Sequence, residues 1–130
     1  MSYIEKLITQ WHIDRNLIEG ATAAAQTVKL LEEFIEVVAA QMPEASPLQI
    51  ASAVIQSVNG LLETGRIKTV STKNAKTAFK DGIGDMGVVM VNLAVRADST
   101  LSECMQIAYK EIEHRKGEMR NGIWVKEEDL

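Results

Sequence analysis

Three carboxylates lie close together in the stretch Lys29–Val38. At 100° per residue, Glu32, Glu36 and Glu33 fall at about 0°, 40° and 100° around a helix, and the apolar side chains of this stretch occupy the opposite arc. Like charges at such spacings repel one another by roughly a few tenths of a kcal/mol per pair. We therefore expect a positive group to meet this face, although an EExxE pattern also suits a plain solvated helix face.

A second polar set enters the apolar segment Met86–Val95. Asp81, Asp85 and Asn92 are spaced i, i+4 and i+11, so they lie within about 40° of one another on a helix. Because the segment is apolar nearly all round, we expect it to be buried, and a buried carboxylate needs a base, a helix terminus or a metal. The alternative is a helix N-cap, which suits Asp81 better than Asp85.

The segments Lys29–Glu36 and Asp81–Val89 resemble the all-α nucleoside triphosphate pyrophosphohydrolases, the MazG-like and dCTPase/dUTPase-like group, and its small phage-type members above all. Weaker similarity extends to Trp11–Ile18 and Glu111–Met119, so the resemblance covers about half of the chain. It implies an all-α fold, a compact helical bundle of about five helices, as a single domain over residues 1–130. Residues 43–72 would then be an inserted loop-helix segment and residues 122–130 a tail.

The family pattern is ExxE, a spacer and then ExxD, with the four carboxylates around Mg²⁺. Glu33 and Glu36 match the first pair and Asp85 matches the final aspartate, whereas Gly82 stands where the pattern has a glutamate. Asp81, one helical turn before Asp85, is the candidate for the missing oxygen ligand. The resemblance thus implies Glu33, Glu36 and Asp85 as ligands of the metal, Mg²⁺ with Mn²⁺ as a substitute, and we add Asp81 as the fourth candidate ligand.

The reaction implied is cleavage of a (deoxy)nucleoside triphosphate to the monophosphate and pyrophosphate. Glu32 or Glu36 would accept the proton of the attacking water, with a pKa raised by the neighbouring carboxylates. Lys116 is the candidate for holding the phosphates, with Arg115 or Arg120 assisting, and a solvated charged face is the alternative for all three. Because Gly82 and the long spacer depart from the pattern, the other hypothesis is a catalytically silent helical module that binds nucleotides or proteins.

A base-binding pocket needs a few polar groups in apolar surroundings, and Asn92 and Trp11 are the candidates for it. The alternative for Trp11 is the core, which is the more common place for a Trp that shares a helical face with Ile4, Leu7 and Ile8. Neither the base nor the sugar of the substrate follows from the sequence.

Capping patterns place the helix starts. We expect helices over Ser2–Asn16 with a Ser2–Glu5 capping box, over Ala21–Gln41, over Pro47–Thr64 with Ser46 as N-cap, through the apolar segment, and from Thr100 to about Asn121. On the last of these, Tyr109, Glu113, Lys116 and Arg120 would share one face. Ile123–Val125 suggests that the tail docks onto the rest of the chain.

The net charge of −4 offers no basic face for a nucleic acid. The single Cys104, the charged residues near the start of the chain and the shortness of the Met86–Val95 run predict a soluble cytoplasmic protein, or one of the host cytoplasm if a phage encodes it. Glycines at 82, 84 and 87 permit close helix approach, and the aliphatic third helix offers much apolar surface. We therefore expect a homo-oligomer, a dimer or a tetramer.

Overall fold

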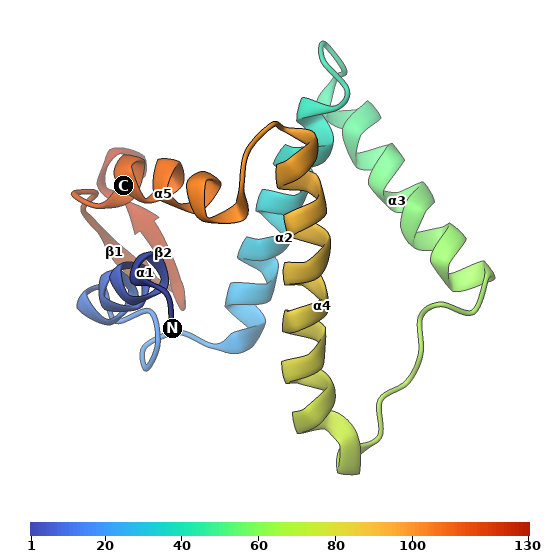
Figure 1. Ribbon diagram of the computed structural model, residues 1–130, viewed down its shortest axis with the longest axis horizontal. Coiled ribbons are helices and arrows are strands. Elements are labelled where there is room, and N and C mark those ends of the chain that lie inside the picture. The colour runs from blue at the N-terminus through green and yellow to red at the C-terminus, as the bar shows by residue number, and fades with distance from the viewer. The chain divides into compact units, whose positions relative to one another are not determined.

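The computed structural model describes all 130 residues, as five α-helices and one two-stranded antiparallel sheet (Figure 1). The elements are α1 (Tyr3–Asp14), α2 (Ala23–Ala40), α3 (Pro47–Glu63), α4 (Ala75–Arg96), α5 (Leu101–Ile112), β1 (Gly117–Arg120) and β2 (Ile123–Lys126), with short 3₁₀ turns η1 (Thr72–Asn74) and η2 (Glu127–Asp129). The predicted number of helices is therefore confirmed, and the sheet was not predicted. The chain divides into two compact units, Met1–Thr22 with Ser71–Leu130, and Ala23–Val70. The single domain over residues 1–130 stays a prediction.

Side-chain caps fix where three of the helices begin. At α1, the Ser2 hydroxyl accepts a hydrogen bond from the Glu5 amide, and Glu5 accepts one from the Ser2 amide in return. At α3, Ser46 and Gln49 form the same reciprocal box, and Pro47 occupies the first turn, where its missing amide hydrogen costs nothing. At α5, the Thr100 hydroxyl accepts from the Glu103 amide at 3.0 Å. The helix starts predicted at Ser2, Ser46 and Thr100 are confirmed.

Helix α4 begins earlier than Asp81. It starts at Ala75, directly after η1, and runs without interruption to Arg96. The interpretation of Asp81 as an N-cap is therefore wrong. Ala75–Lys80 contains neither proline nor glycine, so nothing stops the helix from extending back over these residues.

The predicted last helix is too long. Helix α5 ends at Ile112, and the following residues form a hairpin in which Gly117 pairs with Lys126 and Arg120 with Ile123. Asn121 and Gly122 form its two-residue turn with φ of 53° and 79°, the left-handed values that a type I′ turn requires. Lys116 and Arg120 therefore do not share a helical face with Tyr109 and Glu113, contrary to the prediction.

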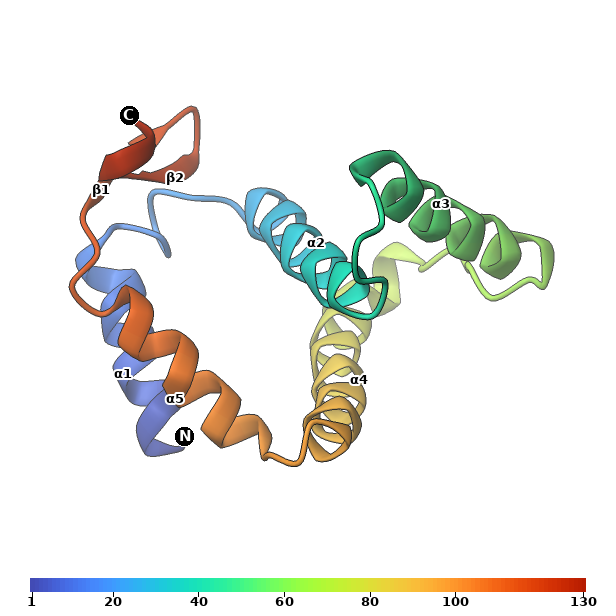
Figure 2. The same cartoon turned by 90° about the horizontal axis from the view of Figure 1, so that it is seen from above.

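The buried side chains all belong to the unit Met1–Thr22 with Ser71–Leu130, and they are Ile4, Trp11, Leu17 and Ala94. Helices α1 and α5 lie side by side in this unit (Figure 2). Trp124 of β2 contacts Trp11 edge to face, with ring centroids 5.5 Å apart. The prediction that the tail docks is thus confirmed.

Burial of the apolar segment of α4 is not confirmed. Within Met86–Val95 only Ala94 is buried, while Val88 is 71% and Val95 is 64% exposed. In the other unit, α2 and α3 contact each other, yet neither contains a buried residue. The apolar arc of α2 is likewise largely open, with Phe34 52% exposed.

Candidate functional site

The acidic face of α2 consists of Glu32, Glu33 and Glu36, all of them exposed. Lys29, one turn earlier on the same helix, lies 3.0 Å from Glu32 and 3.5 Å from Glu33, measured from its Nζ to the nearest carboxylate oxygen. The positive group expected at this face is thus in part the helix's own lysine. Glu32 raises the pKa of the Lys29 ammonium through a hydrogen bond, with further help from the charge of Glu33.

Glu36 lies one helical turn after Glu32 and Glu33, the two ion-pair partners of Lys29. The negative charge of Glu33 raises the pKa of the Glu36 carboxyl, and a hydrogen bond with Glu33 raises it further. Lys29 opposes this shift without cancelling it. Two carboxylates that disfavour each other's ionised form are a suitable place for a cation, because a cation replaces the repulsion by attraction.

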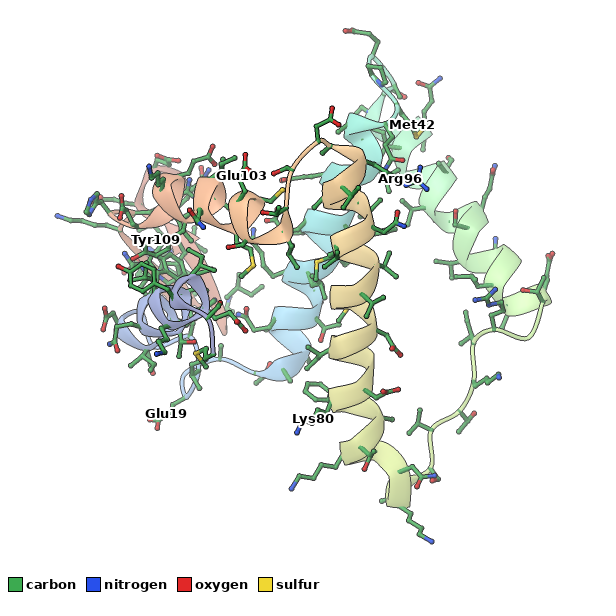
Figure 3. The ribbon with its side chains drawn as sticks, viewed as in Figure 1. Glu19, Met42, Lys80, Arg96, Glu103 and Tyr109 are labelled. Carbon is green, nitrogen blue, oxygen red and sulfur yellow. The ribbon has the colours of Figure 1, made fainter.

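The carboxylates of α4 are placed by the continuous helix. Asp81 and Asp85 are exposed and stand one turn apart, on the stripe that also carries Asn92 and Arg96. The Arg96 Nε donates a hydrogen bond of 2.8 Å to the Asn92 Oδ1, so the side-chain oxygen of Asn92 is already engaged. Figure 3 shows Lys80 and Arg96 projecting from the two ends of this part of α4. Asp85 is exposed in the single chain, so its predicted entry into a buried helix is not confirmed.

The donor chemistry on α2 fits a hard divalent cation, which prefers carboxylate oxygens. Glu33 and Glu36 belong to one unit, and Asp81 and Asp85 belong to the other. No group of three or more His, Cys, Asp or Glu side chains stands ready to hold a metal ion. Each pair by itself therefore supplies part of a ligand set, and the set of four stays a prediction.

The three basic candidates for phosphate binding separate into two places. Arg115 and Lys116 line a shallow depression of about 560 Å³, together with Lys110. Three glutamates share its rim, namely Glu111, Glu127 and Glu128, so the depression carries charge of both signs. Arg120 lies on β1 and forms an ion pair with Glu118. Of the predicted three, Lys116 and Arg115 remain together and Arg120 is engaged elsewhere.

Trp11 and Arg15 hold the end of α5 against α1. The Trp11 Nε1 donates a hydrogen bond of 2.9 Å to the Ile112 carbonyl, and the residue is 8% exposed. The Arg15 guanidinium lies 4.2 Å from the centre of the Trp11 ring and donates to the carbonyls of Glu113 and Arg115. These contacts tie the last residue of α5 and the segment that follows it to α1. Trp11 thus occupies the core, the alternative to a base pocket.

Sequence reasoning missed three participants. The ion pairs of Lys29 were predictable from its i, i+3 and i, i+4 spacing to Glu32 and Glu33, but the stretch was interpreted only as a cluster of carboxylates. Lys110 joins Arg115 and Lys116 only because the chain turns after Ile112. The role of Arg15 depends on residues about a hundred positions away, and no local pattern signals it.

Comparison with known proteins shows similarity to a phage protein. The chain is 34% identical over 89 residues to an uncharacterized 18.2 kDa protein in the rep-hol intergenic region of Haemophilus phage HP1. The match spans 68% of this chain and 36% of that protein. No family model matches the chain, and no solved structure matches it. None of the helices is long and apolar enough to span a membrane.

Proposed function

We propose that this protein is a Mg²⁺-dependent pyrophosphohydrolase that cleaves a (deoxy)nucleoside triphosphate to the monophosphate and pyrophosphate. The observation that carries the proposal is the Glu33–Glu36 pair on an exposed helix face, where one carboxylate raises the pKa of the other. Surface carboxylates gain stability when they alternate with lysines. A pair that retains its mutual repulsion despite Lys29 is better suited to binding a cation than to stabilising its helix.

In this proposal Glu33 and Glu36 hold the metal together with Asp85, and Asp81 supplies the oxygen that Gly82 cannot. When bound, Mg²⁺ neutralises phosphate charge and lowers the pKa of a water molecule. The assignment of the α4 residues rests on the resemblance of Asp81–Val89 to the family pattern. Manganese is the expected substitute because it accepts the same oxygen donors.

The proton of the attacking water passes to a carboxylate of the same face. Glu36 is suited to this only where it is not fully engaged with the metal, since the charge of Glu33 then raises its pKa and makes it a stronger base than an ordinary glutamate. Glu32 is the second candidate, although its carboxylate accepts a hydrogen bond of 3.0 Å from Lys29. The phosphates would be held by Lys116 and Arg115 at the depression that they line.

The phage origin of the relative supports a place of action in the cytoplasm of a host cell. A second candidate function is a silent module of the same helical kind, which binds nucleotides or proteins without turnover. The observation that favours it is Gly82, which puts no side chain at the position where the family pattern has a metal ligand.

Pyrophosphate release tests the first proposal. Wild type and Glu33→Gln are assayed with a panel of canonical and modified (deoxy)nucleoside triphosphates, with Mg²⁺ and with chelator. We expect release that needs Mg²⁺ on at least one substrate and falls at least about 100-fold in the variant, as for the loss of one charge-stabilising group. Glu19→Gln is the matched control, because it removes an exposed glutamate outside the acidic face.

Thermal unfolding separates the two candidates. A ligand that binds only the folded state raises the melting temperature. If no triphosphate is hydrolysed and Mg²⁺ leaves the melting temperature of wild type unchanged, the pyrophosphohydrolase is excluded. If a triphosphate raises the melting temperature without being cleaved, the binding module is supported.

A further inference from the structure

The chain contains two Asn–Gly pairs, Asn59–Gly60 and Asn121–Gly122. In such a pair the main-chain nitrogen of the glycine can attack the side-chain Cγ of the asparagine, because glycine has no Cβ to hinder the approach. Both asparagines are exposed, so water and hydroxide reach both of them. The two pairs therefore match in composition and in access to solvent, and they differ in the backbone that contains them.

The first pair is held in helical conformation. Asn59 and Gly60 lie inside α3, and the Gly60 carbonyl accepts a hydrogen bond of 3.0 Å from the Thr64 amide. The Gly60 amide, as in any α-helix, donates to the carbonyl four residues earlier, that of Gln56. Attack on Asn59 requires that this bond break and that the peptide rotate out of helical geometry. The reaction at Asn59 is therefore slowed by the free energy of opening α3 at that point.

The second pair has no such restraint. Asn121 and Gly122 are the two-residue turn of the hairpin, with φ of 53° and 79°, and the last pair of the ladder is Arg120 with Ile123. The Gly122 amide donates no hydrogen bond to another backbone group, so its nitrogen is free. The turn also stands at the open end of the hairpin, where a change of its conformation breaks no helix. Opening therefore costs less here than inside α3.

We propose that Asn121 is a site of spontaneous deamidation and that α3 protects Asn59 from the same reaction. The Gly122 nitrogen loses its proton to hydroxide and bonds to the Asn121 Cγ. The Cγ–Nδ2 bond then breaks, and the nitrogen leaves as ammonia after taking a proton from water. Water opens the resulting succinimide ring at either of its two carbonyls, which gives aspartate or isoaspartate without any oxidant or reductant. The inference is independent of the proposed enzymatic activity.

The two products differ in their effect on the hairpin. Asp–Gly also suits a type I′ turn, so aspartate keeps the turn and adds one negative charge. Isoaspartate instead leads the main chain through the former side chain and adds a methylene group to the backbone. A two-residue turn lengthened in this way no longer fits the pairing of Arg120 with Ile123. We expect isoaspartate at this position to loosen β2 and with it the contact between Trp124 and Trp11.

Peptide mass spectrometry after incubation of the full chain tests the site. The conversion of each asparagine is followed by the change in mass from amide to carboxyl, and chromatography separates aspartyl from isoaspartyl peptides. In native buffer we expect Asn121 to convert at least about tenfold faster than Asn59, because local opening free energies differ widely between turns and helices. Conversion should be faster at higher pH, since hydroxide removes the Gly122 proton. In urea that unfolds the chain, the two asparagines should convert at similar rates.

Two variants separate the modification from its consequences. Asn121→Gly keeps a turn that Gly–Gly permits and has no side-chain amide to lose, so its tryptophan fluorescence should stay constant during incubation while that of wild type changes. Freshly purified Asn121→Asp should have the fluorescence of wild type, because it has the added charge without the altered backbone. The proposal is overturned if Asn121 stays unmodified in native buffer while the unfolded chain reacts. It is equally overturned if Asn59 converts as fast as Asn121 in the folded protein.

Discussion

At the scale of single residues, the charge of Glu33 controls the protonation of Glu36. Because the folded-state pKa of Glu36 is raised, its contribution to stability is present at low pH and is lost as the pH rises through that pKa. Glu33→Gln removes the charge, so we expect the pKa of Glu36 to fall towards its ordinary value. A ¹³C NMR titration of the Glu36 carboxyl measures this. An unchanged Glu36 pKa would mean that the two carboxylates do not interact in solution.

Gly82 offers a second test at this scale. A side chain added there meets no atom within 4 Å, so substitution is free of clashes. Gly82→Ala and Gly82→Glu should each stabilise the protein by about 0.5–1 kcal/mol, because glycine is a poor residue in a helix interior. Only Gly82→Glu restores ExxD with Asp85, so we expect Mg²⁺-dependent pyrophosphate release to rise in this variant and not in Gly82→Ala. Equal release from both variants would contradict the assignment of α4 to the metal.

At the scale of elements, the sequence predicted the features that interactions between neighbouring residues determine. It did not predict the features that depend on distant residues. The starts of α1, α3 and α5 follow from Ser2, Ser46 and Thr100, whose caps act within three residues. The hairpin was also predictable, because Asn121–Gly122 is the strongest short signal for a type I′ turn, but the helical pattern of α5 was continued through it. The placing of Arg15 and Trp11 was beyond a local reading, since their partners lie at the other end of the chain.

The sequence could predict which carboxylates lie together on one helix, but not which helices combine to form a metal site. The helical repeat places Glu33 beside Glu36 and Asp81 beside Asp85, and α2 and α4 are continuous over these residues. Whether the two pairs act together depends on tertiary structure, which spacing along a helix does not encode. Burial of an apolar segment such as Met86–Val95 stays a prediction for the same reason, because it depends on a surface that covers the segment.

The hairpin gives a prediction about an element. A Cβ added at Gly117 would lie 2.2 Å from the Val125 carbonyl oxygen and 2.6 Å from the Trp124 ring, so the strands would have to separate. We expect Gly117→Ala to destabilise the protein by about 1–3 kcal/mol, as overpacking does. Urea unfolding followed by tryptophan fluorescence measures this. Gly60→Ala is the control, because its added Cβ meets nothing within 4 Å and should be neutral or stabilising.

At the scale of the whole molecule, the two units differ in what holds them. The unit Met1–Thr22 with Ser71–Leu130 contains every buried side chain and the Trp11–Ile112 hydrogen bond, whereas Ala23–Val70 contains no buried residue. Protection of amides against hydrogen exchange follows local stability. Protection of α1 and α5 should therefore be independent of protein concentration.

Protection of α2 and α3 should instead depend on association, because the homo-oligomer that we expect would cover their exposed apolar residues. We expect their amides to exchange faster on dilution, by the factor by which the monomer fraction rises. Hydrogen exchange with mass spectrometry at two protein concentrations measures this peptide by peptide, and Ile55→Glu/Val58→Glu should show the fast exchange at both concentrations. Equal protection of α2 and α3 at concentrations where sedimentation finds monomer and dimer would mean that the Ala23–Val70 unit is stable without a partner. The exposed apolar surface of this unit would then not indicate that the unit needs a partner.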